Sequence, residues 1–331
     1  MRMHKSGEFS PNKSIIWLIF ARDTVCIAPQ RRVKNVSREP QNPRDRITGH
    51  QITQRYFATQ IPAFRSVACL DIPSADERGA VILQALRRVG IAGRTFIDMS
   101  CYAIQTGQFE VGHFASGAHA YLAIDGFLKS PDEVIDDATL QNFAKITPQY
   151  PGLRAALDPE VLEAWSAALS PVLSQTFGYP QGAWSMIAWH SIVSTPPGDL
   201  QPIQCFPHVD GTDPDQFAMM LYLDHTPHGG TAFFQHNSTG LDALTAKTFP
   251  RYKAALEADV ARTGLPPRRY ITDGAPHFTR TYQTPGTFNQ AVFYRGNLLH
   301  SGVIDNDASL SPDPRKGRYT INAFLRPPPQ S

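Results

Sequence analysis

Short apolar segments of strand-like composition recur through the second half of this 331-residue chain. Residues 319–325 (YTINAFL) alternate in polarity, as a β-strand with one buried face does. Residues 291–294 and 217–223 are apolar almost throughout, which is typical of strands buried on both faces. Residues 186–193 form another such segment. The pattern predicts a mainly β core over about residues 184–326.

A His-x-Asp motif precedes the apolar segment at residues 217–223. His208 and Asp210 are separated by one residue, and extended backbone directs residues i and i+2 to the same side. One short stretch can therefore supply an imidazole and a carboxylate to the same point. By itself the motif is weak, because a chain with 11 histidines has roughly an even chance of containing one by accident in a surface loop.

Two later residues make the motif informative. A Gly-Gly-Thr turn at residues 229–231 is followed by His300, which comes after an apolar segment, and by Arg318, which opens another. Two imidazoles and one carboxylate can occupy one face of an iron(II) ion and leave the opposite positions open for a cosubstrate and dioxygen. The residues therefore predict a reactive iron site formed by His208, Asp210 and His300.

Over about residues 184–326 the chain resembles the iron(II)/2-oxoglutarate-dependent dioxygenases, and within them the prolyl-hydroxylase-like branch. The His-x-Asp motif, the later histidine, the later arginine and the Gly-Gly-Thr step carry this resemblance. It implies that His208, Asp210 and His300 are the catalytic iron ligands, and that Arg318 binds the far carboxylate of 2-oxoglutarate. The implied fold is mainly β, a double-stranded β-helix or jelly-roll like that of the cupins, with helices supporting one sheet.

Other residues are implied to assist the cosubstrate. Tyr222 matches a strand tyrosine that often hydrogen-bonds the same carboxylate in this family. Thr320 and Asn322 lie on the same strand face as Arg318, so they are expected to add hydrogen bonds. An arginine suits this position because a planar guanidinium forms a bidentate charged pair with a carboxylate.

The interval between His300 and Arg318 is longer than in the family. Residues 305–316 are rich in Asp, Ser and Pro, so we interpret the excess as a loop insertion. Arg326 and Arg295 stay open as alternative partners of the cosubstrate.

The resemblance implies an oxidoreductase that hydroxylates or desaturates a small-molecule or amino-acid-like substrate. It would consume 2-oxoglutarate and O2, release succinate and carbon dioxide, and use iron(II), with ascorbate as a reductant. Two other classes stay open, a cupin-like metal-binding or sensor protein without turnover and a zinc-dependent hydrolase. Arg318 argues against pure metal binding, which needs no cation opposite the metal, and a hydrolase would ignore 2-oxoglutarate.

Charge and composition divide the chain. Residues 1–75 carry 12 Lys and Arg against 5 Asp and Glu, although the net charge of the whole chain is only +2. This stretch shows no sustained period, which predicts a disordered extension. A nucleic-acid-binding arm is the alternative, disfavoured by the sparse aromatic residues, and whether residues 1–55 belong to the folded protein stays open. Residues 76–331 form the predicted dioxygenase domain, with helical support at 76–180 and a jelly-roll core at 184–326.

Three segments carry helix signals. Residues 76–90 begin with acidic residues and end at a glycine, and residues 159–178 begin at a proline and end at another glycine. Residues 241–264 predict a further helix, interrupted by Pro250, that could cover the active site as a lid.

The remaining histidines are expected to be mostly structural. His119 and His190 have apolar neighbours, as core or rim histidines do, although His190 could face the pocket. His225 and His228 predict a surface pair in a turn. His236 is a weaker candidate for substrate contact.

Targeting signals are not evident. The apolar run at residues 15–20 is too short for a signal-peptide core or a membrane span. The four cysteines form no CxxC pair, so neither a zinc ribbon nor a disulfide framework is indicated. We expect a cytoplasmic protein with a small-molecule substrate and without membrane or nucleic-acid partners, and its oligomeric state stays open.

Overall fold

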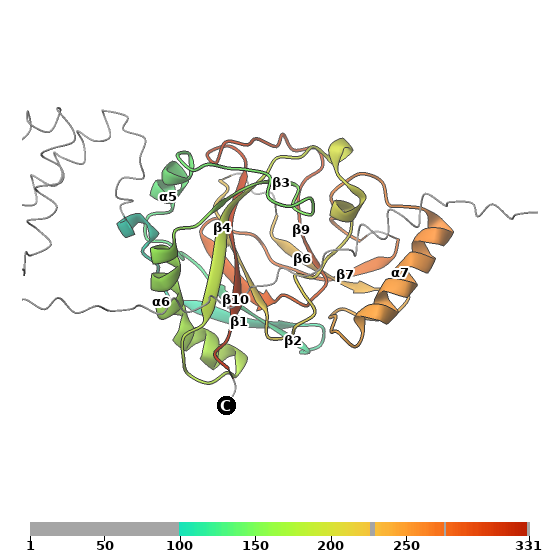
Figure 1. The fold of residues 1–331 in the computed structure, drawn as a ribbon, viewed down its shortest axis with the longest axis horizontal. Helices are drawn as coiled ribbons and strands as arrows, with labels where there is room; N and C mark the ends of the chain where they lie inside the picture. The colour runs from blue at the N-terminus through green and yellow to red at the C-terminus, as the bar shows by residue number, and fades with distance from the viewer. Residues whose placement is uncertain (1–98, 226–228, 275, 330–331) are drawn as a thin grey trace, which may run out of the picture. The chain divides into compact units, whose positions relative to one another are not determined.

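The structure is a computed structural model that describes residues 99–225, 229–274 and 276–329 (Figure 1). The basic stretch 1–75 and the predicted helix 76–90 lie outside these residues, so the expectations about them stay predictions. Within the described part, no helix has the length and apolar character needed to cross a membrane.

Two antiparallel sheets make up the core. The larger sheet has seven strands in the order β1-β2-β8-β5-β10-β4-β3, and the smaller has three in the order β7-β6-β9. In that order, the larger sheet contains β1 (Phe109–Phe114), β2 (His119–Ile124), β8 (Gln290–Arg295), β5 (Phe217–Tyr222), β10 (Arg318–Arg326), β4 (Ser185–Val193) and β3 (Gly152–Ala156). The smaller contains β7 (Phe278–Gln283), β6 (Thr231–His236) and β9 (His300–Gly302).

The two sheets face one another across a shared apolar interior. Phe233 of β6 packs with Tyr222 of β5 and with Val292 and Tyr294 of β8. Each sheet therefore covers the inner face of the other, which is the arrangement of a jelly-roll-like core. The predicted fold class, mainly β with supporting helices, is confirmed.

Helix α6 (Pro159–Phe177) covers the outer face of the larger sheet, at the left in Figure 1. The Asp158 carboxylate caps it by accepting from a first-turn N–H at 2.9 Å, and Gly178 ends it in the left-handed conformation, with φ of 75°. Phe177 packs on Phe217 of β5, with ring centroids 4.6 Å apart. The helix predicted over residues 159–178 is confirmed.

The part expected to give helical support also contributes strands. β1, β2 and β3 all lie within residues 76–180, where β2 pairs with β8 and β3 pairs with β4. These strands are five or six residues long, too short for their pattern to separate them from helix, and long-range hydrogen bonds to the sheet define them. The helical expectation holds for α6 and for the shorter elements of this part, which are α5 (Pro131–Ala138) and η1 (Met99–Tyr102).

Helix α7 (Phe249–Thr263) begins later than predicted. Pro250 is in its first turn, where a missing N–H costs nothing, so it starts the helix instead of interrupting it. The preceding residues extend along the smaller sheet, and Leu241 bridges to His236. The buried face of α7, with Tyr252 among its residues, packs on an apolar cluster beside β6 and β7, at the right in Figure 1. Two short turns, η2 (Pro197–Asp199) and η3 (Pro202–Cys205), lead from β4 toward the His-x-Asp motif.

His190 of β4 lies in the core, on the outer face of the larger sheet, and does not line the cavity described below. It is 2% exposed, and its Nδ1 lies 2.7 Å from the Tyr319 hydroxyl. The Tyr102 hydroxyl lies 3.4 Å from Nε2 and donates to Asp137, so it can accept from a ring N–H. Burial lowers the pKa of His190 to about 4.

We expect His190 to make the fold acid-sensitive. Between about pH 6.5 and pH 4 an unfolded histidine binds a proton and the buried one does not, so acidification favours the unfolded state, by up to about 3 kcal/mol. Above about pH 6.5 the effect vanishes. Urea unfolding of wild type and of His190→Gln from pH 7 to pH 4 measures the effect. The free energy of unfolding should fall more steeply with decreasing pH in wild type than in the variant. Parallel pH profiles would contradict the assignment.

Candidate metal centre and cosubstrate cavity

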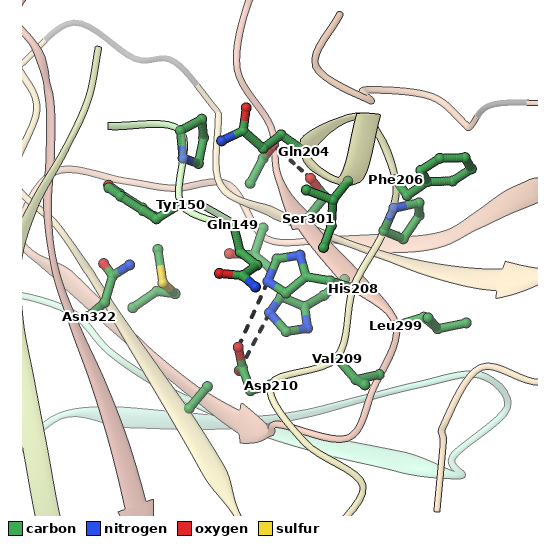
Figure 2. Close-up of a pocket in the computed structure, with 18 of the residues that line it drawn as sticks. Gln149, Tyr150, Gln204, Phe206, His208, Val209, Asp210, Leu299, Ser301 and Asn322 are labelled. Atoms are coloured by element: carbon green, nitrogen blue, oxygen red, sulfur yellow. Dashed lines mark hydrogen bonds and ion pairs between the residues drawn. The ribbon is translucent and has the colours of Figure 1, made fainter. Parts of the chain in front are cut away.

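A cavity of about 470 Å³ opens between the two sheets (Figure 2). This volume is within the range of small-molecule sites, roughly 300–1,000 Å³. In Figure 2, Tyr150 and Asn322 lie to one side of the His208 and Asp210 side chains. Apolar side chains lie on the other side, and those shared with the cluster under α7 are Phe206, Leu244, Tyr252, Leu256 and Leu299. The cavity therefore has an apolar wall beneath α7 and a mixed wall on the side of Tyr150 and Asn322, where Met220 of β5 lies directly opposite Asn322.

Backbone pairing brings the His-x-Asp motif to β9. The His208 N–H donates to the His300 carbonyl at 2.9 Å, and the His300 N–H donates to the His208 carbonyl at 2.8 Å. Asp210 is tied in the same way, by an N–H bond of 2.7 Å to the Gly296 carbonyl. The motif thus behaves as an edge strand of the smaller sheet, and its side chains emerge beside that of His300.

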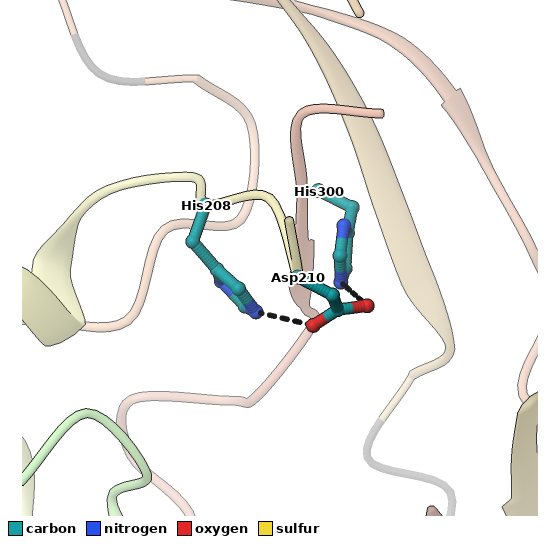
Figure 3. Close-up of side chains that lie close together, drawn as sticks. All are labelled: His208, Asp210 and His300. Atoms are coloured by element: carbon teal, nitrogen blue, oxygen red, sulfur yellow. Dashed lines mark ion pairs between the residues drawn. The ribbon is translucent and has the colours of Figure 1, made fainter. Parts of the chain in front are cut away.

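The three predicted ligands converge on the cavity wall (Figure 3). One potential ligand atom from each lies within 4.8 Å of the others. The Asp210 carboxylate is 3.8 Å from His208 Nε2 and 3.6 Å from His300 Nε2. Ligands bound to one metal at about 2.0–2.2 Å lie at most about 4.4 Å apart, so these contacts suit a shared ion. This is the group of potential metal ligands found among the described residues.

The orientation of His300 favours a cation between it and Asp210. His300 Nδ1 lies 2.8 Å from the Leu298 carbonyl oxygen, which can only accept, so this nitrogen carries the hydrogen. A neutral His300 then directs the Nε2 lone pair toward the carboxylate. Two acceptors in that arrangement repel each other, and a bound metal ion would turn both into ligands.

The electrostatics of the cluster also suit a metal. The pKa of His208 lies well below its ordinary value because burial disfavours the cation, and His300 and Arg154 add positive charge nearby. About half of its side chain is still accessible, because it opens onto the cavity. Burial raises the pKa of Asp210, while His300 and Arg154 lower it. A neutral imidazole is the form that binds a metal, so protons compete little at His208 near neutral pH.

Arg318 places a guanidinium in the same cavity. It opens β10 and is 3% exposed, yet Nε and Nη2 have no hydrogen-bond partner among the described residues. Gly302 of β9 leaves room for it, since a Cβ there would lie 3.2 Å from Nη2. A buried guanidinium with free donors is unfavourable unless a ligand uses them.

The two alternative arginines are engaged elsewhere. Arg326 pairs with Asp213 at 2.5 Å, and Arg295 donates to the Tyr179 hydroxyl at 3.1 Å. Neither lines the cavity. Residues 303–317 contain no strand, in agreement with a loop between β9 and β10.

Tyr222 and Thr320 lie behind the cavity wall. The buried Tyr222 hydroxyl is 2.8 Å from Thr231 Oγ1 and 3.1 Å from Thr284 Oγ1. The Thr320 hydroxyl donates to Asn322 Oδ1 at 2.7 Å. Thr231 and Asn322 do line the cavity, so each predicted contact has a cavity-lining neighbour in front of it. Direct contact of Tyr222 and Thr320 with 2-oxoglutarate stays a prediction.

The Gly-Gly-Thr step explains how Thr231 reaches this position. A Cβ at Gly230 would lie 2.3 Å from the Thr284 carbonyl oxygen, so only glycine fits there. The close approach lets the Thr231 N–H donate to Thr284 Oγ1 at 2.9 Å, which starts β6 beside the cavity.

Arg154 and Tyr150 line the cavity, and the sequence did not indicate them. Arg154 is in β3, whose five residues show no strand period. The sequence signal available was a single arginine among apolar residues. It indicates a cavity-facing side chain only once pairing with β4 defines the side to which Arg154 points.

Among the residues that the structure describes, the other histidines lie outside the cavity lining. His236 is fully buried, with Nε2 3.3 Å from Asp259 of α7, so it joins that helix to β6 and does not line the cavity. His225 Nε2 pairs with Asp132 at 3.0 Å, and His228 lies outside the described residues. His119 pairs with Asp242 at 3.0 Å.

The solved structures that this chain resembles at low similarity include the following two. HygX from Streptomyces hygroscopicus, solved with nickel, 2-oxoglutarate and hygromycin B, is 11% identical, with a TM-score of 0.33 over 62% of this chain and 82% of that one. TqaL, described as an Fe(II)/(alpha)ketoglutarate-dependent dioxygenase, is 14% identical, with a TM-score of 0.24 over 85% of this chain and 87% of that one. At these scores the likeness carries no argument about this site.

Comparisons with known sequences define the family. No curated protein gives a significant match. Residues 106–325 match the profile described as "Family of unknown function (DUF6445)", and this segment includes β1 to β9 and nearly all of β10, with His208, Asp210, His300 and Arg318. The chain therefore belongs to the family DUF6445.

Proposed function

We propose that this protein is an iron(II)/2-oxoglutarate-dependent dioxygenase of the prolyl-hydroxylase-like type. It hydroxylates or desaturates a small-molecule or amino-acid-like substrate and releases succinate and carbon dioxide. One observation carries the proposal: two imidazoles and a carboxylate converge on the wall of a cavity that also holds the buried guanidinium of Arg318, whose Nε and Nη2 have no partner among the described residues.

The residues fit this metal and cosubstrate. Two nitrogen donors and one carboxylate are the donor set of non-haem iron(II) oxygenases, and they leave coordination positions open. His208, Asp210 and His300 would hold the ion, whose role when bound is to activate dioxygen at the expense of 2-oxoglutarate. Arg318 adds a cation that can bind a carboxylate in the same cavity, which a metal-binding protein without turnover does not need.

The chain's own residues have three tasks in this scheme. The Leu298 carbonyl keeps the hydrogen of His300 on Nδ1, so that Nε2 stays free to bind the metal. Arg318 fixes the far end of the cosubstrate, which selects dicarboxylic keto acids over uncharged ones. Helix α7 covers the apolar wall and limits the access of water, as the predicted lid would.

The proposal is tested with the purified full-length protein. Given iron(II), ascorbate and 2-oxoglutarate under air, we expect slow formation of succinate without any added substrate, because the proposed metal and cosubstrate sites need none. Without oxygen, mixing iron(II) and 2-oxoglutarate with the protein should produce a visible charge-transfer band, which reports chelation independently of turnover.

The same measurements separate the other classes. A metal-binding or sensor protein would bind iron(II) and form no succinate. A zinc-dependent hydrolase would cleave esters or amides with zinc, and 2-oxoglutarate would not change its rate. Either result would overturn the proposal.

We also propose a cytoplasmic location. Iron(II) stays reduced most readily in a reducing compartment, and Cys205 is a buried free thiol. Fractionation of cells that express the tagged full chain tests this location directly.

A further inference from the structure

Arg154 projects into the cavity from a different strand than Arg318. β3 and β10 both pair with β4, and Arg154 and Thr320 both oppose Ser191. Residues directly opposite in an antiparallel sheet point to the same face, and residues two apart in a strand do so as well. Arg154, Arg318 and Asn322 therefore emerge from one face, and all three line the cavity.

The guanidinium of Arg154 is held in place without an ion pair. Its Cζ lies 4.0 Å from the centroid of the Tyr150 ring and 5.6 Å from that of Trp189. Stacking on aromatic rings orients a guanidinium plane and leaves its edge free for hydrogen bonds. Arg154 Nε is buried with no hydrogen-bond partner, and none of the carboxylates in the described residues forms an ion pair with this side chain.

Unused polar atoms gather at this end of the cavity. The Tyr150 hydroxyl is buried and, like Arg154 Nε, has no partner that meets hydrogen-bond geometry. The nearby carboxylate of Asp210 would have its charge offset by a bound metal, so it would not serve as the counter-ion of Arg154. Ser191, Thr320 and the Arg154 guanidinium lie near this hydroxyl without meeting that geometry. A buried cation that no carboxylate of the described residues pairs with suits an anion that arrives with the ligand.

The two arginines have different closest contacts, although the Tyr150 hydroxyl lies near enough to feel the positive charge of both. Arg318 lies against Gly302 of β9, the strand that carries His300, which suits the cosubstrate. Arg154 lies against Tyr150, in the loop that leads into β3. The apolar side chains beneath α7 line the same cavity. A molecule bound at Arg154 could therefore place its charged end at the guanidinium and its remaining part against apolar side chains.

We propose that Arg154, assisted by the Tyr150 hydroxyl, binds an anionic group of the substrate, and that the substrate is a small amphipathic carboxylate or phosphate ester. That the bound anion belongs to a substrate rests on the proposed function, but the anion site itself does not depend on turnover.

The test uses full-length protein loaded with zinc and 2-oxoglutarate, which cannot turn over. Calorimetry at constant ionic strength compares three probes of similar size: phenylacetate, phenyl phosphate and neutral phenylacetamide. We expect at least one anion to bind in a 1:1 ratio and at least about tenfold more tightly than the amide, because a charge-assisted bond discriminates against a neutral analogue. The two anions distinguish a carboxylate site from a phosphate site.

Variants assign the binding to these side chains. Arg154→Met should lower the affinity for the anion at least about tenfold and leave the affinity for the amide unchanged. Arg154→Lys should keep part of the affinity for the anion, and Tyr150→Phe should lose a smaller part of it than Arg154→Met does. Arg315→Met is the matched control, since Arg315 is an exposed partner of Asp136 outside the cavity lining. The affinity for 2-oxoglutarate should change less than about threefold in all of them.

Three outcomes would overturn the inference. In the first, neither anion binds better than the amide. In the second, Arg154→Met loses as much affinity for 2-oxoglutarate as for the anion, which would assign Arg154 to the cosubstrate. In the third, Arg154→Met melts well below wild type, which would show a structural cation. If the wild type binds the anion through Arg154 but binds neither metal nor 2-oxoglutarate, the proposed function fails and the anion site stands.

Discussion

Replacing either histidine of the cluster should abolish succinate formation. His208→Ala and His300→Ala each remove one of the three proposed ligands, and we expect a loss of iron(II) affinity of more than about 100-fold, since even the loss of a residue that only orients a ligand costs about 10–100-fold. The variants should also lose the anaerobic charge-transfer band. Succinate by mass spectrometry and iron binding by calorimetry measure the two effects separately.

His225→Ala is the matched control for these variants. His225 pairs with Asp132 and stacks on Phe288, outside the cavity lining, so removing its imidazole should leave both readouts unchanged. Wild-type succinate formation by His208→Ala or by His300→Ala would show that the metal, if any, is bound elsewhere.

The second large effect is expected at Arg318. Arg318→Met should weaken 2-oxoglutarate binding by roughly 2–4 kcal/mol, or about 30–1,000-fold, because it removes a bidentate charged partner and leaves the carboxylate of the cosubstrate unpaired. Iron(II) affinity should stay near that of wild type, since Arg318 is not one of the three clustered ligands. Calorimetry with 2-oxoglutarate on the zinc-loaded protein measures the change.

Arg326→Met is the matched control for Arg318→Met. Arg326 pairs with Asp213, away from the cavity lining, and its replacement should not affect the cosubstrate. If Arg318→Met binds 2-oxoglutarate normally while Arg326→Met or Arg154→Met does not, the cosubstrate has a different orientation from the one proposed.

The convergence of His208 with Asp210 was predictable from the sequence for a local reason. Alternate residues of extended backbone share a face, so two residues of one short segment must point the same way. The approach of His300 was predictable only through the family resemblance, because 92 residues separate it from His208. In the structure, two backbone hydrogen bonds between His208 and His300 bring the segments together.

Tyr222 shows where such a resemblance stops. It correctly placed a tyrosine on a strand of the sheet that carries Arg318, but whether the hydroxyl reaches a ligand depends on its neighbours. Thr231 and Thr284, from two other segments, lie within hydrogen-bond distance of this hydroxyl, so its contact with a cosubstrate stays a prediction. Side-chain partners that come from distant segments leave no periodic pattern in the sequence.

Local patterns in the sequence determined the β character of residues 184–326, the helix at 159–178 and the pairing of an imidazole with a carboxylate, because each depends on periods or end signals within a few residues. Tertiary structure alone decided that β1, β2 and β3 complete the larger sheet, and that Arg154 faces the cavity. Both follow from strand register. A shift of one residue turns a side chain to the opposite face, and long-range hydrogen bonds with β4 and β8 set the register.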